Sequence, residues 1–531
     1  MNDAKLPRMA ARVGDNPARL ISIGILAVIL VLTNTAGHNW GGDYSQYVHH
    51  AVNLVEGHPY ADIGVIRTSS NFLGPDVYPP VLPLMLAPVY WLLGLDWFAM
   101  KAVVVVCFCF ALYVLTLMAA RDLDRVYQPV LVIVLAFNPY IWEFKDRIMS
   151  DFPFLLFCLL TLYLMERRYV REGSGYRDTA NNKLRHGLLL GLLLYLCLAT
   201  REVGAVVIAA VVFFELFHFR KISLATGIAL LVVLLFSGVQ YVSLKSPAAV
   251  SVSQPQAAGS AVEPARQDIP TSHIRVIQDT LTLSSIKLQL ERYAGSAREI
   301  WPNSNNPYLQ IAGLIVFSLT LVFAMAGYFR AVISGPGVSE IFVGGYLVAI
   351  LLFAGYQGTR YLIPVIPFLF LYAFRFHADM LHAGYGKLML PVAGVFVAIT
   401  AATYVAGYQA NARVTPMGIT SEPAVRFFEY VRKHTPEDSI LVFEKPRVLS
   451  LLTGRAATAW PYRRTPDALL AHMQETGADY LVVSRIYWNG NCRPVRTRPE
   501  VPAQLELDYS NDYFLVYKRQ PAARRAGDEQ R

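Results

Sequence analysis

Apolar runs long enough to cross a lipid bilayer recur along this chain of 531 residues. A helix needs about 20 apolar residues to cross the hydrocarbon core, and it satisfies its own backbone hydrogen bonds there. Only 16% of the residues are charged and 54% are hydrophobic, whereas a soluble globular chain carries roughly 25% charged residues. The sequence therefore predicts a multipass α-helical membrane protein. The formal net charge of +9 needs no nucleic acid to explain it, because cytoplasmic loops are rich in Lys and Arg.

The basic residues set the expected orientation. Four of them precede the first apolar run, which lacks a signal-cleavage pattern, so the N-terminus is predicted to be cytoplasmic. A dense cluster of arginines at 167–185 marks another inside loop, and the proline-interrupted run 80–95 is then an external interfacial or re-entrant element. About eleven spans follow from this choice, at 20–36, 98–120, 127–143, 151–167, 187–200, 203–217, 222–243, 308–330, 341–356, 361–376 and 388–407.

The predicted fold is a transmembrane helical bundle with a small external α/β domain. The transmembrane domain covers 1–407 and includes external loops at 37–97 and 245–307; the external domain covers 408–519, and 520–531 is a disordered tail. The external domain is expected to contain helices at 422–433, 447–452 and 466–476 and strands at 440–444, 480–484 and 513–517. The five cysteines form no CxxC pair and are expected to be structural thiols: Cys107, Cys109, Cys158, Cys197 and Cys492.

Asp43 places a carboxylate where the chain leaves the first span, after two glycines. The helix expected to run on to Glu56 carries Tyr44 and Tyr47 on one apolar face. Asp43 with Gln46 three residues later also matches a capping box. A helix cap and a catalytic carboxylate therefore both explain Asp43.

The second external loop carries Lys145, Arg147 and Asp151. Positive charges outside oppose the usual orientation rule, which indicates that they serve a function. Asp151 begins the next span, where aspartate is also a favoured helix cap. Both interpretations of Asp151 stay open at this point.

Three further arginines are expected on the external side. Arg201 lies at a break between two short apolar runs, Arg360 begins a late span, and Arg67 lies in the first loop. Arginine binds phosphate through paired N–H donors. An internal ion pair, for example of Arg201 with Glu202 or Asp151, is the alternative.

Evidence for a metal or cofactor is weak. His49 and His50 are adjacent, and neighbouring side chains on a helix point in different directions, so a solvated or interfacial role is favoured for them. No Walker loop, GxSxG or HExxH motif occurs in a usable context. No cofactor or metal ligand is predicted, and a divalent metal requirement is left open.

The order of these features resembles the GT-C superfamily of integral membrane glycosyltransferases, and within it the protein mannosyltransferase and lipid A aminoarabinose transferase branch. The resemblance covers essentially the whole chain and rests on the order and topology of loose motifs. They are Glu56-Gly57-His58-Pro59-Tyr60, Tyr78-Pro79-Pro80, Ser150-Asp151-Phe152-Pro153, Thr200-Arg201-Glu202 and Arg360-Tyr361-Leu362-Ile363-Pro364, with Leu451-Leu452-Thr453-Gly454-Arg455 in the tail.

The resemblance implies a transferase that uses a polyprenyl-phosphate sugar. Asp43 would be the first-loop catalytic carboxylate and Asp151 the second-loop acidic residue. This chain has Tyr44 where many members carry a second acid, and Tyr78 where aminoarabinose relatives carry a Lys. The donor phosphate would then be bound by some of Arg201, Arg360, Arg147 and Lys145, and the substrate pocket would include Tyr44, Tyr47, Tyr78, Glu202 and Tyr361.

The predicted function is transfer of a hexosyl or pentosyl group to a hydroxyl of a glycan, lipid or protein at the external face of the cell inner membrane. A single displacement would invert the anomeric centre. Two other hypotheses remain. A transporter or flippase for lipid-linked sugars would use the arginines but need no base, and a non-catalytic cell-envelope assembly protein would need neither.

Overall fold

The computed structural model describes residues 17–68, 70–71, 73–75, 77–172, 175–179, 181–244, 283–301, 306–353, 356, 358–412, 418–486 and 500–520. Several predictions lie outside these residues. They concern Cys492, the basic residues before 17, the first part of the loop 245–307 and the tail 521–531.

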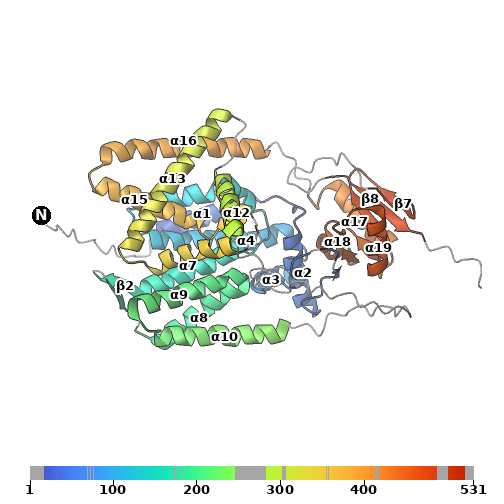
Figure 1. The fold of residues 1–531 in the computed structure, drawn as a ribbon, viewed down its shortest axis with the longest axis horizontal. Helices are drawn as coiled ribbons and strands as arrows, with labels where there is room; N and C mark the ends of the chain where they lie inside the picture. Colours follow the sequence, from blue (N-terminus) through green and yellow to red (C-terminus); the bar gives the residue numbers. More distant parts are fainter. Residues whose placement is uncertain are drawn as a thin grey trace, which may run out of the picture. The chain divides into compact units, whose positions relative to one another are not determined.

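Most of the described chain is helical, as Figure 1 shows. Six described helices are long and apolar enough to cross a membrane, namely α4 (Trp97–Ala119), α8 (Lys183–Thr200), α9 (Ala205–Phe219) with the preceding turn η1 (Glu202–Gly204), α10 (Leu224–Leu244), α13 (Pro307–Ile333) and α16 (Gly386–Ala412). Four shorter helices are also apolar, α1 (Pro17–Leu32), α3 (Val81–Leu93), α5 (Tyr127–Ala136) and α14 (Val338–Leu352). The chain is therefore a helical membrane protein, as predicted.

The expected span 127–143 is wrong as a single helix. It consists of α5 and a separate helix α6 (Pro139–Phe144), with Asn138 between them. The Asn138 side chain accepts hydrogen bonds from the Tyr140 and Ile141 amides and so caps α6. Pro139 in the first turn of α6 has no N–H to give to α5, which favours a new helix at this point.

The helices α7 (Asp151–Arg168), α8 and α9 lie side by side (Figure 1). The chain turns between α8 and α9 through Arg201, whose backbone is extended, and the short helix η1. A side chain at Gly204 would come within 2.5 Å of the Cys197 carbonyl, so this close turn requires glycine. The predicted break between two short spans at Arg201 is confirmed.

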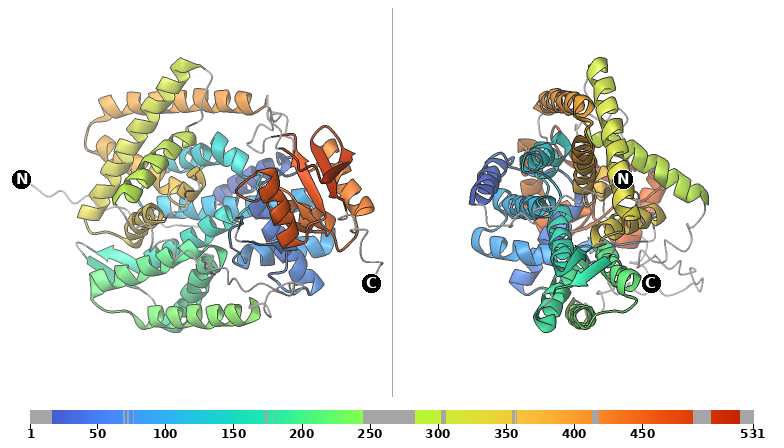
Figure 2. Two further views of the ribbon diagram at one scale, coloured as in Figure 1. Left: turned by 45° about the vertical axis from the view of Figure 1, so that its right-hand side comes forward. Right: turned by 90° about the vertical axis from the view of Figure 1, so that its left-hand side faces the viewer.

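The helix predicted at 361–376 begins later than expected. A short 3-10 helix, η3 (Gly358–Leu362), precedes α15 (Ile366–His382). Pro364 and Pro367 bracket the start of α15, and the residue before a proline disfavours helical geometry, so Arg360 lies in η3 and not in the long helix. α15 packs along α13, which Figure 2 shows from two sides.

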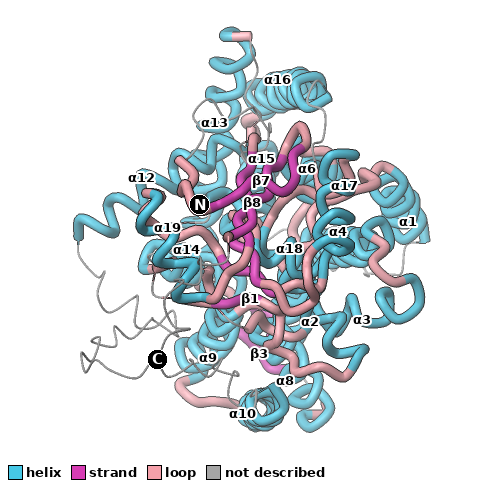
Figure 3. The backbone as a smooth tube through the Cα atoms, turned by 90° about the vertical axis from the view of Figure 1, so that its right-hand side faces the viewer, coloured by secondary structure: helices cyan, strands magenta, loops and turns pink. Residues whose placement is uncertain are grey.

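A six-stranded mixed sheet, magenta in Figure 3, joins β1 of the first loop to the strands of the C-terminal region, with strand order β1-β5-β4-β6-β8-β7. Parallel pairing joins β1 to β5, β5 to β4 and β4 to β6, and the last two pairs are antiparallel. The strands are β1 (Val65–Ile66), β4 (Ile440–Val442), β5 (Ala456–Thr458), β6 (Tyr480–Ser484), β7 (Leu505–Ser510) and β8 (Phe514–Arg519), and the helices are α17 (Glu422–His434), α18 (Pro446–Thr453) and α19 (Pro466–Thr476).

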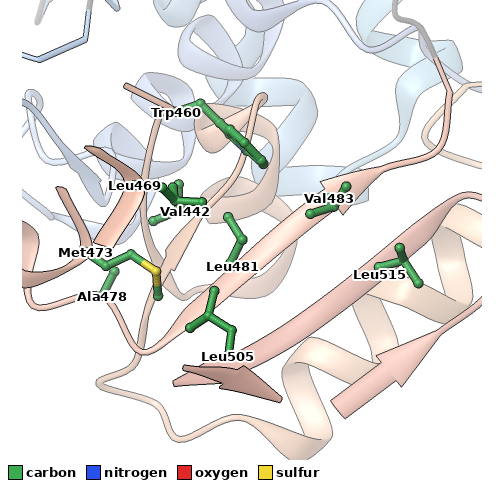
Figure 4. Packing of buried hydrophobic residues seen from close by; sticks show 9 residues of the cluster. All are labelled: Val442, Trp460, Leu469, Met473, Ala478, Leu481, Val483, Leu505 and Leu515. Carbon is green, nitrogen blue, oxygen red and sulfur yellow. The ribbon is translucent and has the colours of Figure 1, made fainter. Parts of the chain in front are cut away.

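The sequence predicted the three helices and the strands β4, β6 and β8, but it missed β1, β5 and β7. A cluster of buried apolar side chains contributed by the sheet, by α19 and by connecting segments holds this region together, and Figure 4 labels its members, Val442, Trp460, Leu469, Met473, Ala478, Leu481, Val483, Leu505 and Leu515. Burial of apolar side chains is the main stabilising contribution in a small folded region of this kind.

The structure divides into two compact units. The spans belong to one unit, whereas residues 35–99 group with the C-terminal region in the other. The segment 37–97, predicted as the first external loop, joins the C-terminal sheet through β1, and the Ile419 amide donates to the His38 carbonyl at 2.9 Å. Trp40 is buried, with ring centroids 5.6 Å from both Phe428 and Phe514. The predicted boundary at 407/408, which assigned this loop to the transmembrane domain, did not include these pairings.

Candidate functional sites

The first candidate site is built around Asp43 in α2 (Gly42–Glu56). The Tyr78 hydroxyl donates to Asp43 Oδ1 at 2.8 Å. The guanidinium of Arg447, from α18, donates to the Tyr78 hydroxyl at 3.1 Å and lies 3.6 Å from the same Asp43 oxygen. The Asp43 side chain is 35% exposed. This carboxylate is thus held by Tyr78 and Arg447 and remains partly exposed to solvent.

Aromatic rings enclose the held side of Asp43. The Tyr47 ring lies 4.7 Å from the Tyr78 ring, and the Arg447 guanidinium lies over Tyr78 at 5.4 Å from its centroid. Burial raises the pKa of the Tyr78 hydroxyl above its usual value; Arg447 opposes this shift and Asp43 adds to it. Tyr78 therefore keeps its proton, which it needs in order to donate to Asp43.

Buried His50 fixes the position of Tyr78. Burial lowers the pKa of His50 to about 3, so the ring is neutral at ordinary pH. Nδ1 lies 2.6 Å from the Tyr60 carbonyl, which can only accept, so Nδ1 carries the proton. Nε2 then accepts from the Tyr78 amide at 3.2 Å. The expectation that this histidine is solvated or interfacial is wrong, since His50 is fully buried.

The second candidate site is built around Asp151, at the start of α7. Its side chain is 1% exposed and both oxygens are engaged. Arg201 donates to Oδ1, and Arg360 Nε donates to Oδ2 at 2.8 Å. The Arg201 guanidinium also lies 5.1 Å from the centroid of the Tyr361 ring. Four predicted site residues therefore lie together: Asp151 of α7, Arg201 at the break between α8 and α9, and Arg360 and Tyr361 of η3.

Asp43 and Asp151 are not the N-cap residues of their helices, so the helix-cap interpretation of both aspartates is wrong. The N-cap of α2 is Gly41 and that of α7 is Ser150. Asp43 and Asp151 each lie in the first turn of their helix, where a negative charge still favours the helix dipole. The side-chain contacts described above are therefore additional to any role at the helix end.

Other predicted site residues lie elsewhere. Lys145 is buried and donates to the Thr33 carbonyl and to Asn34, each at 3.0 Å, and it pairs with Asp146 at 3.2 Å. Arg147 pairs with Glu143 on the surface at 2.5 Å.

Three more predictions have simple structural outcomes. Tyr44 is fully buried and stacks on His38, with ring centroids 3.6 Å apart. Glu202 is exposed in η1. Arg67 donates to the carbonyls of Gly74 and Pro75 and so holds a loop.

Sequence analysis missed Arg447 and Lys445. Both belong to the C-terminal region, which was predicted as a separate domain, and an arginine at the start of a short amphipathic helix gives no signal of its own. Burial lowers the pKa of Lys445, with Glu444 and Asp43 acting in the opposite direction.

In the part of the chain that the structure describes, no group of three or more His, Cys, Asp or Glu side chains is placed to hold a metal ion.

Comparison with known proteins identifies the fold. Neither any protein-family model nor any curated protein sequence matches the chain. Solved structures do match, and they show that the chain shares their fold.

Two of these structures can be named. ArnT from Cupriavidus metallidurans, solved with bound undecaprenyl phosphate, is similar with a TM-score of 0.53 and 13% identity over 94% of this chain and 98% of that one. The archaeal oligosaccharyltransferase AglB from Archaeoglobus fulgidus, solved with an inhibitory peptide and a dolichol-phosphate, has a TM-score of 0.51 and 11% identity over 88% of this chain and 69% of that one.

Proposed function

We propose that this chain is a membrane glycosyltransferase that moves a sugar from a polyprenyl-phosphate donor to an acceptor hydroxyl. The observation that carries the proposal is that the chain contains two chemical parts, one in each of its two units. One is a partly exposed carboxylate, Asp43, and the other is a buried pair of arginines, Arg201 and Arg360, around Asp151. Two proteins of the same fold bind polyprenyl or dolichol phosphates.

The arginines supply the electrostatic part of the chemistry. The guanidinium groups of Arg201 and Arg360 bracket the Asp151 carboxylate, and these side chains are at most 15% exposed. A buried guanidinium group is stabilised by an anion, and arginine fits phosphate oxygens geometrically. Arg201 and Arg360 would therefore bind the donor phosphate and stabilise the charge that develops on it.

Asp43 supplies the base. The acceptor hydroxyl oxygen attacks the anomeric carbon, and its proton passes to Asp43. The bond from the anomeric carbon to the phosphate oxygen breaks, with its electron pair moving to the phosphate. A single displacement of this kind inverts the anomeric centre. The pattern of basic loops assigns Asp43 and the arginines to the same external side of the membrane, which supports a role for both in one reaction.

The same loop pattern supports the proposed cellular setting. A cytoplasmic N-terminus and a periplasmic or extracellular C-terminal domain follow from it, with the spans in the cell inner membrane. The acceptor would be a glycan, lipid or protein that exposes a hydroxyl group on that side.

The test is Asp43→Asn, with Glu56→Gln at the far end of the same helix as the matched control. Transfer would be measured in a deletion strain by mass spectrometry of its glycans, glycolipids and glycoproteins, and donor-site integrity by binding of undecaprenyl phosphate to the purified full chain. Loss of transfer with normal binding and normal Glu56→Gln activity supports the proposal. Unchanged transfer in Asp43→Asn removes Asp43 from the mechanism, and transbilayer movement of a lipid-linked sugar without transfer would identify a transporter.

A further inference from the structure

We propose that Arg447 is a positioning residue for Asp43, so that the C-terminal region completes the site of the proposed base. This inference rests on the proposed function and goes beyond it, because it brings a residue of the C-terminal region into the reaction. It depends on contacts inside one compact unit, which contains Asp43, Tyr78 and Arg447.

The position of α18 against the first loop is specific. The Ser450 hydroxyl donates to the Ile63 carbonyl at 2.9 Å. Gly64 has a φ of +61°, and a side chain there would come within 2.3 Å of the Ser450 hydroxyl, so only glycine permits this approach. The Ala457 amide also donates to the Gly64 carbonyl at 2.9 Å. These bonds hold the first turn of α18, and with it Arg447, beside α2.

Arg447 controls the direction of the Tyr78 hydrogen bond. A guanidinium can only donate, so the Tyr78 oxygen must accept from Arg447 Nη1 at 3.1 Å. The single Tyr78 proton is then directed to Asp43 Oδ1, 2.8 Å away. Without Arg447 the hydroxyl is able to turn away, because nothing would require its oxygen to accept on that side.

The burial of Arg447 indicates a functional role. Its side chain is 8% exposed, and its Nε and Nη2 atoms have no hydrogen-bond acceptor among the described residues. Unsatisfied donors on a buried charge oppose folding. Stability alone therefore does not explain an arginine here. A buried cation 3.6 Å from Asp43 acts on the carboxylate more strongly than it would in bulk water, and it favours the ionised form that a base needs.

The expected effect is on the chemical step. Arg447→Gln should lower kcat roughly 10- to 100-fold, by analogy with the loss found when a hydrogen-bond partner of a metal ligand is removed. KM for the donor and binding of undecaprenyl phosphate should not change, because Arg201 and Arg360 are intact. Removing the cation lets Asp43 take up a proton more readily, so the acid limb of the pH–rate profile should move to higher pH. Lys445 and Tyr78, which also face Asp43, are left in place. Arg447→Lys keeps the charge and should restore part of the rate and most of the profile.

The control is Arg455→Gln, in the same unit. Arg455 donates to the carbonyls of Arg432 and Thr435 at 3.0 and 3.1 Å, and so reports on the fold of this region without contacting Asp43. Tyr78→Phe combined with Arg447→Gln should be no worse than the more impaired single variant, since Arg447 acts through Tyr78 and Asp43. If Arg447 had only a structural role, the activity losses of the two single variants would add in the double variant, and the pH–rate profile would not shift.

The experiment uses the purified full chain in lipid nanodiscs, with membranes of the deletion strain as the source of donor and acceptor. If the wild type transfers no sugar, the proposed function fails. If the wild type transfers sugar and Asp43→Asn does not, while Arg447→Gln matches the wild type in rate and pH profile, only the role of Arg447 is overturned. If Arg447→Gln does not fold, Arg447→Lys decides: a transfer rate equal to that of Arg455→Gln or no higher than that of Asp43→Asn would contradict the proposal, and an intermediate rate would support it.

Discussion

Asp43 and Asp151 are both aspartates in the first turn of a helix, yet their surroundings differ. Asp43 is 35% exposed and meets one tyrosine and one arginine at a single oxygen. Asp151 is 1% exposed, and an arginine engages each of its oxygens. A base must take up a proton from an acceptor that reaches it. Asp43 meets this requirement, whereas Asp151 is better suited to hold two arginines in place.

The largest expected difference is between Asp43→Asn and Asp151→Asn. Loss of a general base lowers turnover about 10²–10⁴-fold, and Asp43→Asn should leave the fold intact because its side chain is partly solvated. Asp151→Asn leaves two buried guanidinium groups without their carboxylate, which costs about 3–5 kcal/mol when a buried pair is broken. Folded yield and thermal unfolding of both variants measure the contrast.

Glu143→Gln is the control for Asp151→Asn. It removes a carboxylate from the preceding helix α6, but one that is 56% exposed and pairs only with surface Arg147 in the described structure. We expect it to leave folded yield and transfer unchanged. A fully folded Asp151→Asn with the transfer rate of the Asp43→Asn variant would mean that the two carboxylates do not differ in role.

The second prediction concerns the phosphate ligands. Arg360→Gln should weaken binding of undecaprenyl phosphate roughly 10- to 100-fold, because hydrogen bonds to charged groups contribute about 1.5–3 kcal/mol. Arg147→Gln is the matched control, since Arg147 lies in the turn between α6 and α7 but pairs with Glu143. Equal binding by the two variants would show that the Asp151 group does not hold the donor.

The amino-acid sequence predicts the positions of most long apolar helices because apolar length is a local signal. It also predicted the break at Arg201, where two short runs meet. It failed at Asn138, where one apolar run of sufficient length is divided by a single asparagine cap and a proline. Composition does not distinguish such a run from one continuous helix.

The Asp43 site was only half predictable for a different reason. Asp43 and Tyr78 follow from their place in the first loop, but Arg447 is brought to them by β1 pairing with β5, across nearly four hundred residues. A two-residue strand has too little pattern to be recognised in a sequence. His50 was misjudged because its burial depends on the Tyr60 carbonyl and the Tyr78 amide, which are tertiary partners.

The third prediction uses the neutral state of His50. Because the folded pKa is lowered to about 3 from an ordinary value of 6.5, the folded protein binds fewer protons than the unfolded chain between these values. Neutral His50 therefore makes its full contribution to the free energy of unfolding above pH 6.5. This contribution is lost as the pH falls toward 3, by at most about 1.4 kcal/mol per pH unit.

His50→Gln tests this slope. Glutamine can still donate to the Tyr60 carbonyl and accept from the Tyr78 amide, but it does not titrate. Unfolding of the full chain at pH 4.5, 5.5 and 7 should show a shallower loss of stability in His50→Gln than in the wild type. Some slope should remain, because burial also lowers the pKa of His49 to about 4. Identical slopes would contradict the neutral, buried state of His50.

The smallest expected effect is that of Tyr78→Phe. The change removes one hydrogen bond to Asp43 and the acceptor for Arg447, but it keeps the ring that packs on Tyr47. A single hydrogen bond contributes about 1 kcal/mol, so turnover should fall about 5- to 10-fold while undecaprenyl phosphate binding stays the same. Tyr90→Phe is the control, since Tyr90 donates to the exposed carboxylate of Glu56 at 2.5 Å. A loss as large as that of Asp43→Asn would mean that Tyr78 itself takes part in proton transfer, whereas no loss would mean that the open side of Asp43 alone determines its reactivity.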